Sequence, residues 1–381
     1  LQGAIAGPVR AAADFESVMA DVAKVVDFPT PEAFKTFQGD LLAMAREIPF
    51  AVDGLGEIAA AAGQAGIAGE DILRFTEAAA KIGVAFDVSS QYAGGAMANL
   101  MTALGLSIDE TILLADAMNH LSNNQASSAA EILHVVKNVG AQATMFGFTA
   151  EQTSAFASAM IAAGAQSDVA ATSFRNMGGA LTRGAAATGA QREAFEQLGL
   201  DAEAVARKMQ EDAVGTTVDV LRRISQLPKE QQAALSSQLF GNEARALGPL
   251  LTNLDLLMKS LGLVEDQAGY AGSAYKEFNA QNDTFNANLQ KFLSTLEEFR
   301  IRIGNALIPA LTRLGEALAP LIAKASELAA AYPDLTTAVV GAAASFVAFK
   351  GALAGLRFVG LLGTGGALAM IAKGMTVLRA A

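Results

Sequence analysis

The chain has 381 residues and a formal net charge of −11, and 52% of its residues are hydrophobic. This apolar content excludes wholesale disorder, and an acidic balance without a run of Lys and Arg argues against a general nucleic-acid-binding protein. The chain has no cysteine, which excludes disulfide bonds and thiolate chemistry. Ala is abundant, whereas Tyr and Trp are scarce or absent, so the composition predicts an all-α protein.

Residues 1–30 predict one amphipathic helix, which we place over residues 9–28. Pro29 ends this helix, because a proline disfavours helical backbone at the residue before it. Thr30 is suited to cap the next helix, with Pro31 as its first residue. The apolar stripe of the first helix consists of Phe15, Val18, Met19, Val22, Val25 and Val26.

Residues 31–256 predict a compact core of short helices and helical hairpins. Two helix starts in this core are similar to each other: Ser107 with Glu110, and Thr149 with Gln152, each have the spacing of a capping box. The similarity continues in register over the following helix, which predicts helical hairpins stacked in series. The matching pairs are Thr111/Thr153, Ala115/Ala157, Ala117/Ala159 and Met118/Met160.

Residues 257–333 predict longer helices with a heptad pattern. From Phe285 onward, apolar residues recur at alternating spacings of four and three, with one slip, as in the seam of a coiled coil. Pro309 and Pro320 lie within this stretch, so we expect a kink or a break there. The seam is compatible with packing on the chain itself and with self-association of several copies. Its residues are Phe285, Leu289, Phe292, Leu296, Phe299, Ile303, Leu307, Leu311, Leu314, Leu318, Leu321 and Leu328.

Residues 334–381 predict a hydrophobic helical segment. Lys350 and Arg357 are the only charged residues between positions 335 and 372, and each charge-free run is shorter than the roughly 20 residues of a membrane-spanning helix. Small residues with a spacing of four would allow close helix packing in lipid or in protein. Burial inside an oligomer and insertion into a membrane both remain open. The small residues are Gly341, Ser345, Gly351 and Gly355.

No motif in the sequence indicates catalysis or metal binding. His120 and His134 lie outside metal-binding spacings, and carboxylates such as Asp109 and Glu110 are favourable at a helix N-terminus. The glycine-rich run 360–366 lacks the Lys-Ser/Thr pair of a phosphate-binding loop. We therefore expect a protein that is not an enzyme and that uses no cofactor and no metal.

Residues 15–254 resemble the core region of phage tail tape measure proteins. The order and spacing of several phrases carry this resemblance, and the heptads and the apolar segment after them also look like this family. The phrases are FESVMADV (15–22), LGEIAAAAGQAGI (55–67), LLADAMNHLS (113–122), SSAAEI (127–132), GFTAEQTSAFASAMIAAG (147–164), ATSFR (171–175) and LFGNEA (239–244).

The resemblance implies a structural protein of the virion, located inside the tail tube near the tip and assembled in the host cytoplasm. Proteins of this family fill the tube lumen, nucleate tube assembly at the tip, set tail length and leave during DNA ejection. The implied partners are the tail tube protein, tail tip or baseplate hub proteins and tail assembly chaperones. The resemblance also implies a homo-oligomer of three copies, contact of the apolar part with the host membrane during ejection, and no sequence-specific nucleic acid.

Two further expectations follow from the sequence. A helix rises about 1.5 Å per residue and can encode length, but the Gly and Pro breaks of residues 31–254 predict a folded plug instead of a ruler. The chain begins with Leu1 and ends within an apolar run, so we expect both ends to be internal to a longer protein.

The alternative function is a membrane-active helical protein that forms a pore through residues 335–378. Some tape measure proteins carry a peptidoglycan-cleaving domain, but no such segment is recognisable in this sequence.

Overall fold

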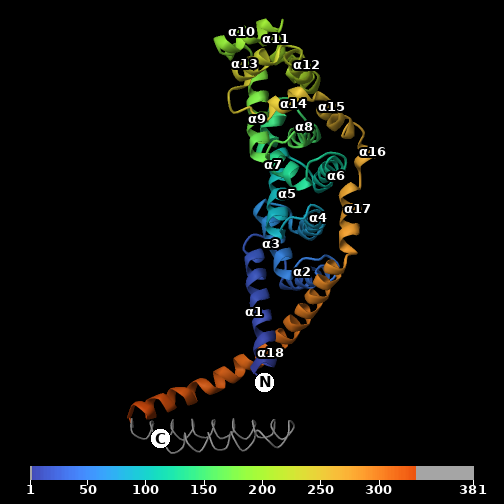
Figure 1. Ribbon diagram of the computed structural model, residues 1–381. Helices are drawn as coiled ribbons and strands as arrows, with labels where there is room; N and C mark the ends of the chain where they lie inside the picture. Colours follow the sequence, from blue (N-terminus) through green and yellow to red (C-terminus); the bar gives the residue numbers. More distant parts are fainter. Residues whose placement is uncertain (1, 332–381) are drawn as a thin grey trace, which may run out of the picture. The chain divides into compact units, whose positions relative to one another are not determined.

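The computed structural model describes residues 2–331, and this part of the chain is helical without a β-strand (Figure 1). The predicted all-α fold class is confirmed. The chain divides into two compact units, Leu1–Asn305 and Ala306–Ala381. The hydrophobic segment expected over residues 334–381, with Gly341, Ser345, Gly351 and Gly355, lies outside the described residues.

The first unit contains seventeen α-helices, two short 3-10 helices and the beginning of the helix that continues into the second unit. The helices are α1 (Gln2–Ala23), α2 (Pro31–Met44), α3 (Val52–Gln64), η1 (Gly69–Asp71), α4 (Ile72–Ala85), α5 (Ser90–Leu104), α6 (Ile108–Asn124), α7 (Ala129–Met145), α8 (Ala150–Ala162), α9 (Ser167–Leu181), η2 (Gly184–Ala186), α10 (Gly189–Gln197), α11 (Ala202–Glu211), α12 (Ala213–Ser225), α13 (Lys229–Phe240), α14 (Leu247–Thr252), α15 (Leu254–Leu263), α16 (Gln267–Tyr270), α17 (Ser273–Asn282) and α18 (Phe285–Ala331).

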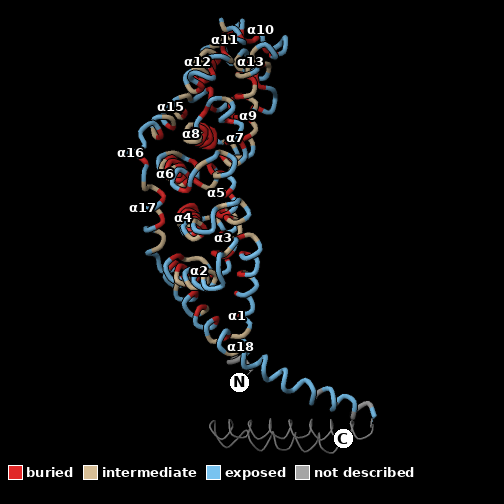
Figure 2. Tube along the Cα trace, turned by 180° about the vertical axis from the view of Figure 1, so that it is seen from behind, coloured by how far each residue is buried: buried red, intermediate tan, exposed pale blue. Residues whose placement is uncertain are grey.

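Helices α3 to α9 stack in two rows. One row consists of α3, α5, α7 and α9, each in contact with the next, and the other consists of α4, α6 and α8 (Figure 1). In Figure 2 most of α8 is coloured as buried, and residues 153–161 of this helix are all buried. Residues 31–254 therefore form helical hairpins in series, as the repeated caps predicted, and not one extended rod.

Capping boxes fix where several of these helices begin. The hydroxyl of the cap residue accepts from a backbone amide three residues on, and the Glu or Gln at that position accepts from the amide of the cap residue. Two of these boxes were predicted, and α7 and α10 begin with two more. The four pairs are Ser107/Glu110, Ser128/Glu131, Thr149/Gln152 and Thr188/Gln191.

The residues shared by the two similar helices, α6 and α8, are all buried. Thr111, Ala115, Ala117, Met118 and the four residues that match them in α8 are at most 2% exposed. Next to α8, three phenylalanine rings pack on one another with centroids 5.2 to 5.7 Å apart; two pairs are edge to face and the third is tilted. These rings, of Phe148, Phe156 and Phe174, join α8 to α9. The two helices are therefore similar in sequence because the matching residues are buried at equivalent positions in the core.

Helix α1 differs from the prediction at both ends. It begins at Gln2 instead of residue 9, with Pro8 inside the helix, and it ends at Ala23. A proline near a helix start removes only one amide donor, and the backbone around Pro8 packs against Gly304 of α18, which supports this turn. Beyond Ala23 the chain turns so that Val25 and Val26 pack against Gly63 of α3.

A segment that we call the strap (α15 to α17, Leu254–Asn282) returns along the row formed by α8, α6 and α4. Helix α15 contacts α8, and α17 contacts α6 and α4 (Figure 1). The strap is anchored by apolar side chains that are almost fully buried, among them Leu257, Tyr270 and Phe278. It brings the chain back from the far end of the stack to the end where α1 begins, and α18 follows there.

Asp116 of α6 holds the strap by capping the N-terminus of α17. Its carboxylate accepts hydrogen bonds from the backbone amides of Gly272 and Ala274, both at 2.8 Å. One turn further along α6, the Asn119 side chain donates to the Ser273 hydroxyl at 2.9 Å. Burial raises the pKa of Asp116, and the two amide hydrogen bonds oppose that rise. A buried carboxylate thus supplies the cap that the residue at the start of α17, Gly272, lacks.

The variant Asp116→Ala should destabilise the first unit by about 1–3 kcal/mol, because two amides at the start of α17 lose their acceptor. The control Glu265→Ala removes an exposed carboxylate from the strap and should have little effect. Chemical denaturation measures both free energies of unfolding. Equal values for the two variants would show that Asp116 does not hold the strap.

Candidate self-association surface

The part of α18 that belongs to the first unit has one face packed on its own chain. Ala287, Ser294 and Ile301 recur every seven residues on this face and are buried. The Ser294 hydroxyl donates to the backbone carbonyl of Phe50 at 3.3 Å. On the same side the buried Glu298 carboxylate lies 3.5 Å from Arg46 of the chain after α2 and 2.7 Å from Arg302. These contacts fix the rotation of α18 about its axis.

The predicted seam lies on the opposite face. A helix turns by about 100° per residue, so Phe292 and Leu296 lie about 160° from Ser294 on either side. Phe285, Phe292 and Phe299 are 80%, 58% and 61% exposed. Leu289 and Leu296 are also exposed, and Ile303 and Leu307 are half-buried. Phe285, Leu289, Phe292, Leu296 and Phe299 are thus exposed, and the function of the seam as a self-association surface remains a prediction.

The seam is wider than the sequence analysis indicated. Leu293 is 48% exposed and lies beside Phe292, on the edge of the apolar face. In a heptad with Leu289 at position a and Phe292 at d, Leu293 is at position e. A leucine at a flanking position could have been recognised from the sequence, because it follows a core position directly.

In the second unit the described part of α18 carries the same heptads. Every residue from 309 to 321 is exposed, including Leu311, Leu314, Leu318 and Leu321, whereas the side chain of Leu328 is not described. The sequence predicted a kink or a break, and the break is wrong: α18 continues through Pro309 and Pro320. Both prolines lie outside the seam, and the carbonyls that they leave without an amide partner belong to the exposed residues Asn305 and Glu316, where water can hydrate them.

Helix α18 crosses α1 at a glycine. A Cβ atom on Gly304 would lie 2.1 Å from the carbonyl oxygen of Pro8 and 2.5 Å from the Cβ of Ala12. Any side chain would therefore push the two helices apart. Gly304 sets how closely α1 and α18 approach.

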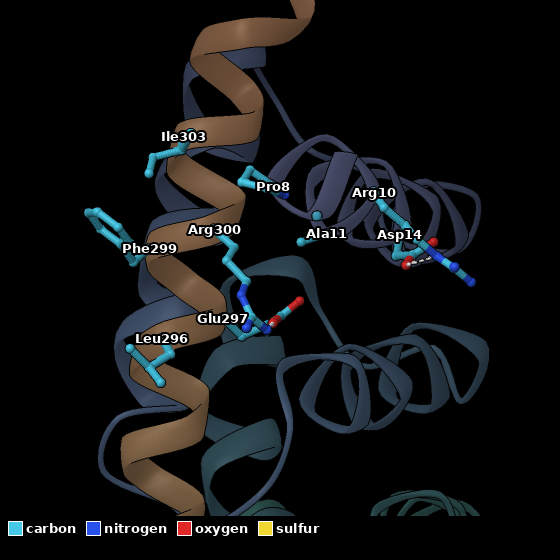
Figure 3. A pocket seen from close by; sticks show the side chains of 10 residues that line it. Pro8, Arg10, Ala11, Asp14, Leu296, Glu297, Phe299, Arg300 and Ile303 are labelled. Atoms are coloured by element: carbon cyan, nitrogen blue, oxygen red, sulfur yellow. Dashed lines mark hydrogen bonds and ion pairs between the residues drawn. The ribbon is translucent and has the colours of Figure 1, made fainter. Parts of the chain in front are cut away.

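A groove of about 550 Å³ lies beside this crossing. In Figure 3, Glu297 and Arg300 project from α18 toward the side where α1 carries Arg10 and Asp14, and Phe299 projects away from α1. The apolar residues Pro8, Ala11, Leu296, Phe299 and Ile303 and the charged residues Arg10, Asp14, Glu297 and Arg300 line the groove.

The charged residues that line the groove pair within each helix. Arg10 lies 3.7 Å from Asp14, and Arg300 lies 3.0 Å from Glu297. Loss of hydration raises the pKa of Asp53 on α3, and the carboxylates of Asp14, Glu297 and Glu57 raise it further. The groove is therefore lined by two carboxylates and two arginines, with Asp53 and Glu57 of α3 nearby.

The remaining polar candidates have local structural explanations. His134 lies 2.7 Å from the carboxylate of Asp168, and Asn138 is 3.0 Å from the same ring nitrogen. Asp109 pairs with Arg74, and Glu110 closes the capping box of α6. Across residues 2–331 no group of three or more His, Asp or Glu side chains could hold a metal ion. In the same range no single helix has the length and hydropathy to cross a membrane, although α5 and α6 reach them as a pair bent by 114°.

Comparisons with known proteins place this chain among phage tail proteins. Residues 38–241 match the family described as "Phage-related minor tail protein". The chain is 34% identical over 369 residues to a "Probable tape measure protein" of Halomonas phage phiHAP-1, an alignment that covers 93% of this chain and 43% of that protein. No solved structure matches.

The chain belongs to the family of phage-related minor tail proteins. The predicted resemblance to tape measure proteins is confirmed, and the family is one of structural phage tail proteins. The chain spans less than half the length of the tape measure protein that it matches.

The crossing of α1 and α18 can be tested with two glycines of the same helix. Gly304→Ala should destabilise the first unit by about 1–3 kcal/mol, because the new methyl group overlaps Pro8 and Ala12. Gly315→Ala meets open space and should be neutral or stabilise α18 by up to about 1 kcal/mol. Thermal unfolding followed by circular dichroism measures both. If Gly304→Ala is as stable as Gly315→Ala, the two helices do not cross at Gly304.

Proposed function

We propose that this chain is the folded core segment of a tape measure protein, which fills the tail tube lumen near the tip, nucleates tube assembly there and is released during DNA ejection. The relative that matches it is named a probable tape measure protein, and this chain corresponds to 43% of its length. The role in setting tail length belongs, in this proposal, to the whole protein. The stacked hairpins of residues 31–254 serve as a plug.

The observation that carries the proposal is the uncovered heptad seam of α18. A helix with an apolar stripe and no tertiary contacts is marginal in water, and residues 309–321 have exposed side chains on all sides. Copies of α18 that meet through their seams would bury these side chains. Each copy keeps its stack on the side opposite the seam, so the stacks point outward and leave the seams free to meet.

We propose that the copies associate in parallel and in register. Phenylalanines occupy the d positions 285, 292 and 299, and Leu or Ile occupies the a positions 289, 296 and 303. In a parallel, in-register assembly the same a or d position of every copy forms one layer of side chains. Each layer then contains a single residue type, so side chains of equal size pack against one another. The family resemblance gives three as the number of copies. This arrangement would produce a single helical rod from which a longer ruler segment can continue.

The proposed partners follow from the location inside a tail. They are the tail tube protein, the tail tip or baseplate hub proteins and the tail assembly chaperones, with host membrane contact during ejection. The net charge of −11 suits release, because an acidic chain in the lumen does not hold DNA by its phosphates. Tight, salt-sensitive binding of DNA by the purified chain would contradict this part of the proposal.

Mass spectrometry of purified phage particles tests the location. Peptides from residues 31–254 and 285–331 should occur at a few copies per particle, in an amount that stays constant relative to the tail tip proteins. Particles that lack these peptides, together with host membranes that contain them, would instead support a pore formed through residues 335–378.

Substitutions in the seam should abolish self-association without unfolding the first unit. Phe292→Glu and Leu314→Glu place charges at d positions that would be buried between copies, whereas Thr295→Glu and Thr312→Glu place the same charge at exposed positions outside the a and d set. Sedimentation velocity should show an oligomer for the original chain and for both threonine variants. It should show monomers for the two seam variants, with unchanged thermal unfolding of the stack. A monomeric original chain at all concentrations would refute the proposed association.

A further inference from the structure

The strap lies along α8, α6 and α4 with few buried side chains of its own. Six of its 29 residues are buried, whereas residues 153–161 of α8, which α15 contacts, are all buried. Its helices are short: α15 and α17 have ten residues each and α16 has four. Helices of this length are marginal in water when they stand alone, so the strap depends on its contacts with the rows. The six buried residues are Leu257, Ser260, Val264, Tyr270, Ala274 and Phe278.

Hydrogen bonds from polar side chains hold the first helix of the strap. The Gln125 side chain, directly after α6, donates to the Ser260 hydroxyl at 3.0 Å. The Lys259 ammonium donates to the backbone carbonyl of Asn124 at 2.7 Å. Ser260 is fully buried, so a polar contact lies inside this interface and not only at its rim.

Polar groups also hold the middle and the end of the strap. Asp116 and Asn119 of α6, which are 4% and 1% exposed, make their hydrogen bonds to the first turn of α17. The Gln281 side chain, near the end of α17, donates to the backbone carbonyl of Ala85 at the end of α4 at 3.3 Å. When such an interface opens, water replaces each hydrogen bond, so separation costs less than at an apolar interface of the same area.

The helices of the rows are joined in a different way, by fully buried apolar side chains. Leu114 and Met118 of α6 and Phe156 and Met160 of α8 are completely inaccessible to solvent. Separation of these helices would expose that apolar surface to water, which is the largest unfavourable term in unfolding. The contacts of the strap therefore favour its opening while the rows stay closed.

We propose that the strap is a releasable segment, which detaches from the rows as one unit while α3 to α9 stay folded. A detached strap spans up to about 100 Å, because an extended chain reaches roughly 3.3–3.6 Å per residue. The helix α18 then depends on its own contacts with the stack, at Pro8, Arg46 and Phe50. Release of the strap is thus a first step in separating the helix that carries the seam from the plug. The opening itself is independent of the proposed function, whereas its place in release from a tail rests on that proposal.

Single cysteines in the full chain measure this opening, because the chain has no cysteine of its own. Ser260→Cys and Ala274→Cys place a thiol on α15 and on α17, and Ser173→Cys and Ala96→Cys place one on α9 and on α5 in the row away from the strap. All four original side chains are at most 4% exposed, and each strap site has a control of the same residue type. Under native conditions both strap thiols should react with a soluble thiol reagent at least about tenfold faster than both controls. Their rates should also depend less on urea, because opening of the strap exposes less surface than global unfolding.

Amide hydrogen exchange of the unmodified chain gives a second measurement, which does not depend on the folding of any variant. Peptides from residues 254–282 should exchange faster than peptides from α5 and α9, again with a weaker dependence on urea. Faster reaction of both strap thiols together with this exchange pattern supports the releasable strap.

Two results would overturn the proposal. If all four thiols react at one rate with the same urea dependence, the strap opens only when the first unit unfolds. If only one strap thiol reacts faster than its control, the strap does not detach as one unit. Neither measurement requires a tail or a second copy, so the releasable strap and the proposed function can fail separately.

Discussion

The rotation of α18 about its own axis determines which of its faces is buried on the stack and which is exposed as the seam. Ala287, Ser294 and Ile301 are small or apolar enough to pack closely on the stack, and they recur every seven residues. The seam follows the same period of seven on the opposite side of α18. Burial of the face with Ser294 therefore leaves the seam exposed along the part of α18 that belongs to the first unit. The Glu298 contacts with Arg46 and Arg302 reinforce this orientation, because a buried carboxylate requires its partners.

The strap gives α18 its position as well as its orientation. The chain forms the two rows of helices and then returns along α8, α6 and α4. As a result, α18 contacts α1 at Gly304. Asp116 and Asn119 tie the start of α17 to α6 midway along the return. The strap and the contact at Gly304 therefore fix where the first part of α18 lies on the stack.

The local signals in the sequence predicted a large part of this fold. The capping boxes of α6 and α8, the Thr30 cap and the heptad seam are determined by residues within one or two turns of each other, so spacing alone identifies them. The first turns of α1 depend on a contact with Gly304, almost 300 residues away in the sequence, and no local pattern reports it. The strap was not predicted for the same reason, since Asp116 caps a helix more than 150 residues later.

The prolines of α18 and the groove show two other limits of sequence reasoning. Pro309 and Pro320 predicted a kink or a break, but the carbonyls that lose their amide partner belong to exposed residues, and the helix continues without a break. The groove requires the crossing angle and the close approach of α1 and α18, which only the folded structure contains. The residues that form its charged rim, Asp14 and Glu297 among them, look like ordinary solvated positions when they are read along the chain.

In the proposed assembly, copies of α18 meet face to face through the seam, in parallel and in register. A cysteine scan tests it most directly, because the chain has no cysteine of its own. Single cysteines would be placed from residue 287 to residue 301 and oxidised under mild conditions. Association through the seam predicts disulfide-linked dimers at positions 289, 292, 296 and 299 and none at positions 287, 294 and 301. Cross-linking without this period, or strongest at position 294, would contradict it.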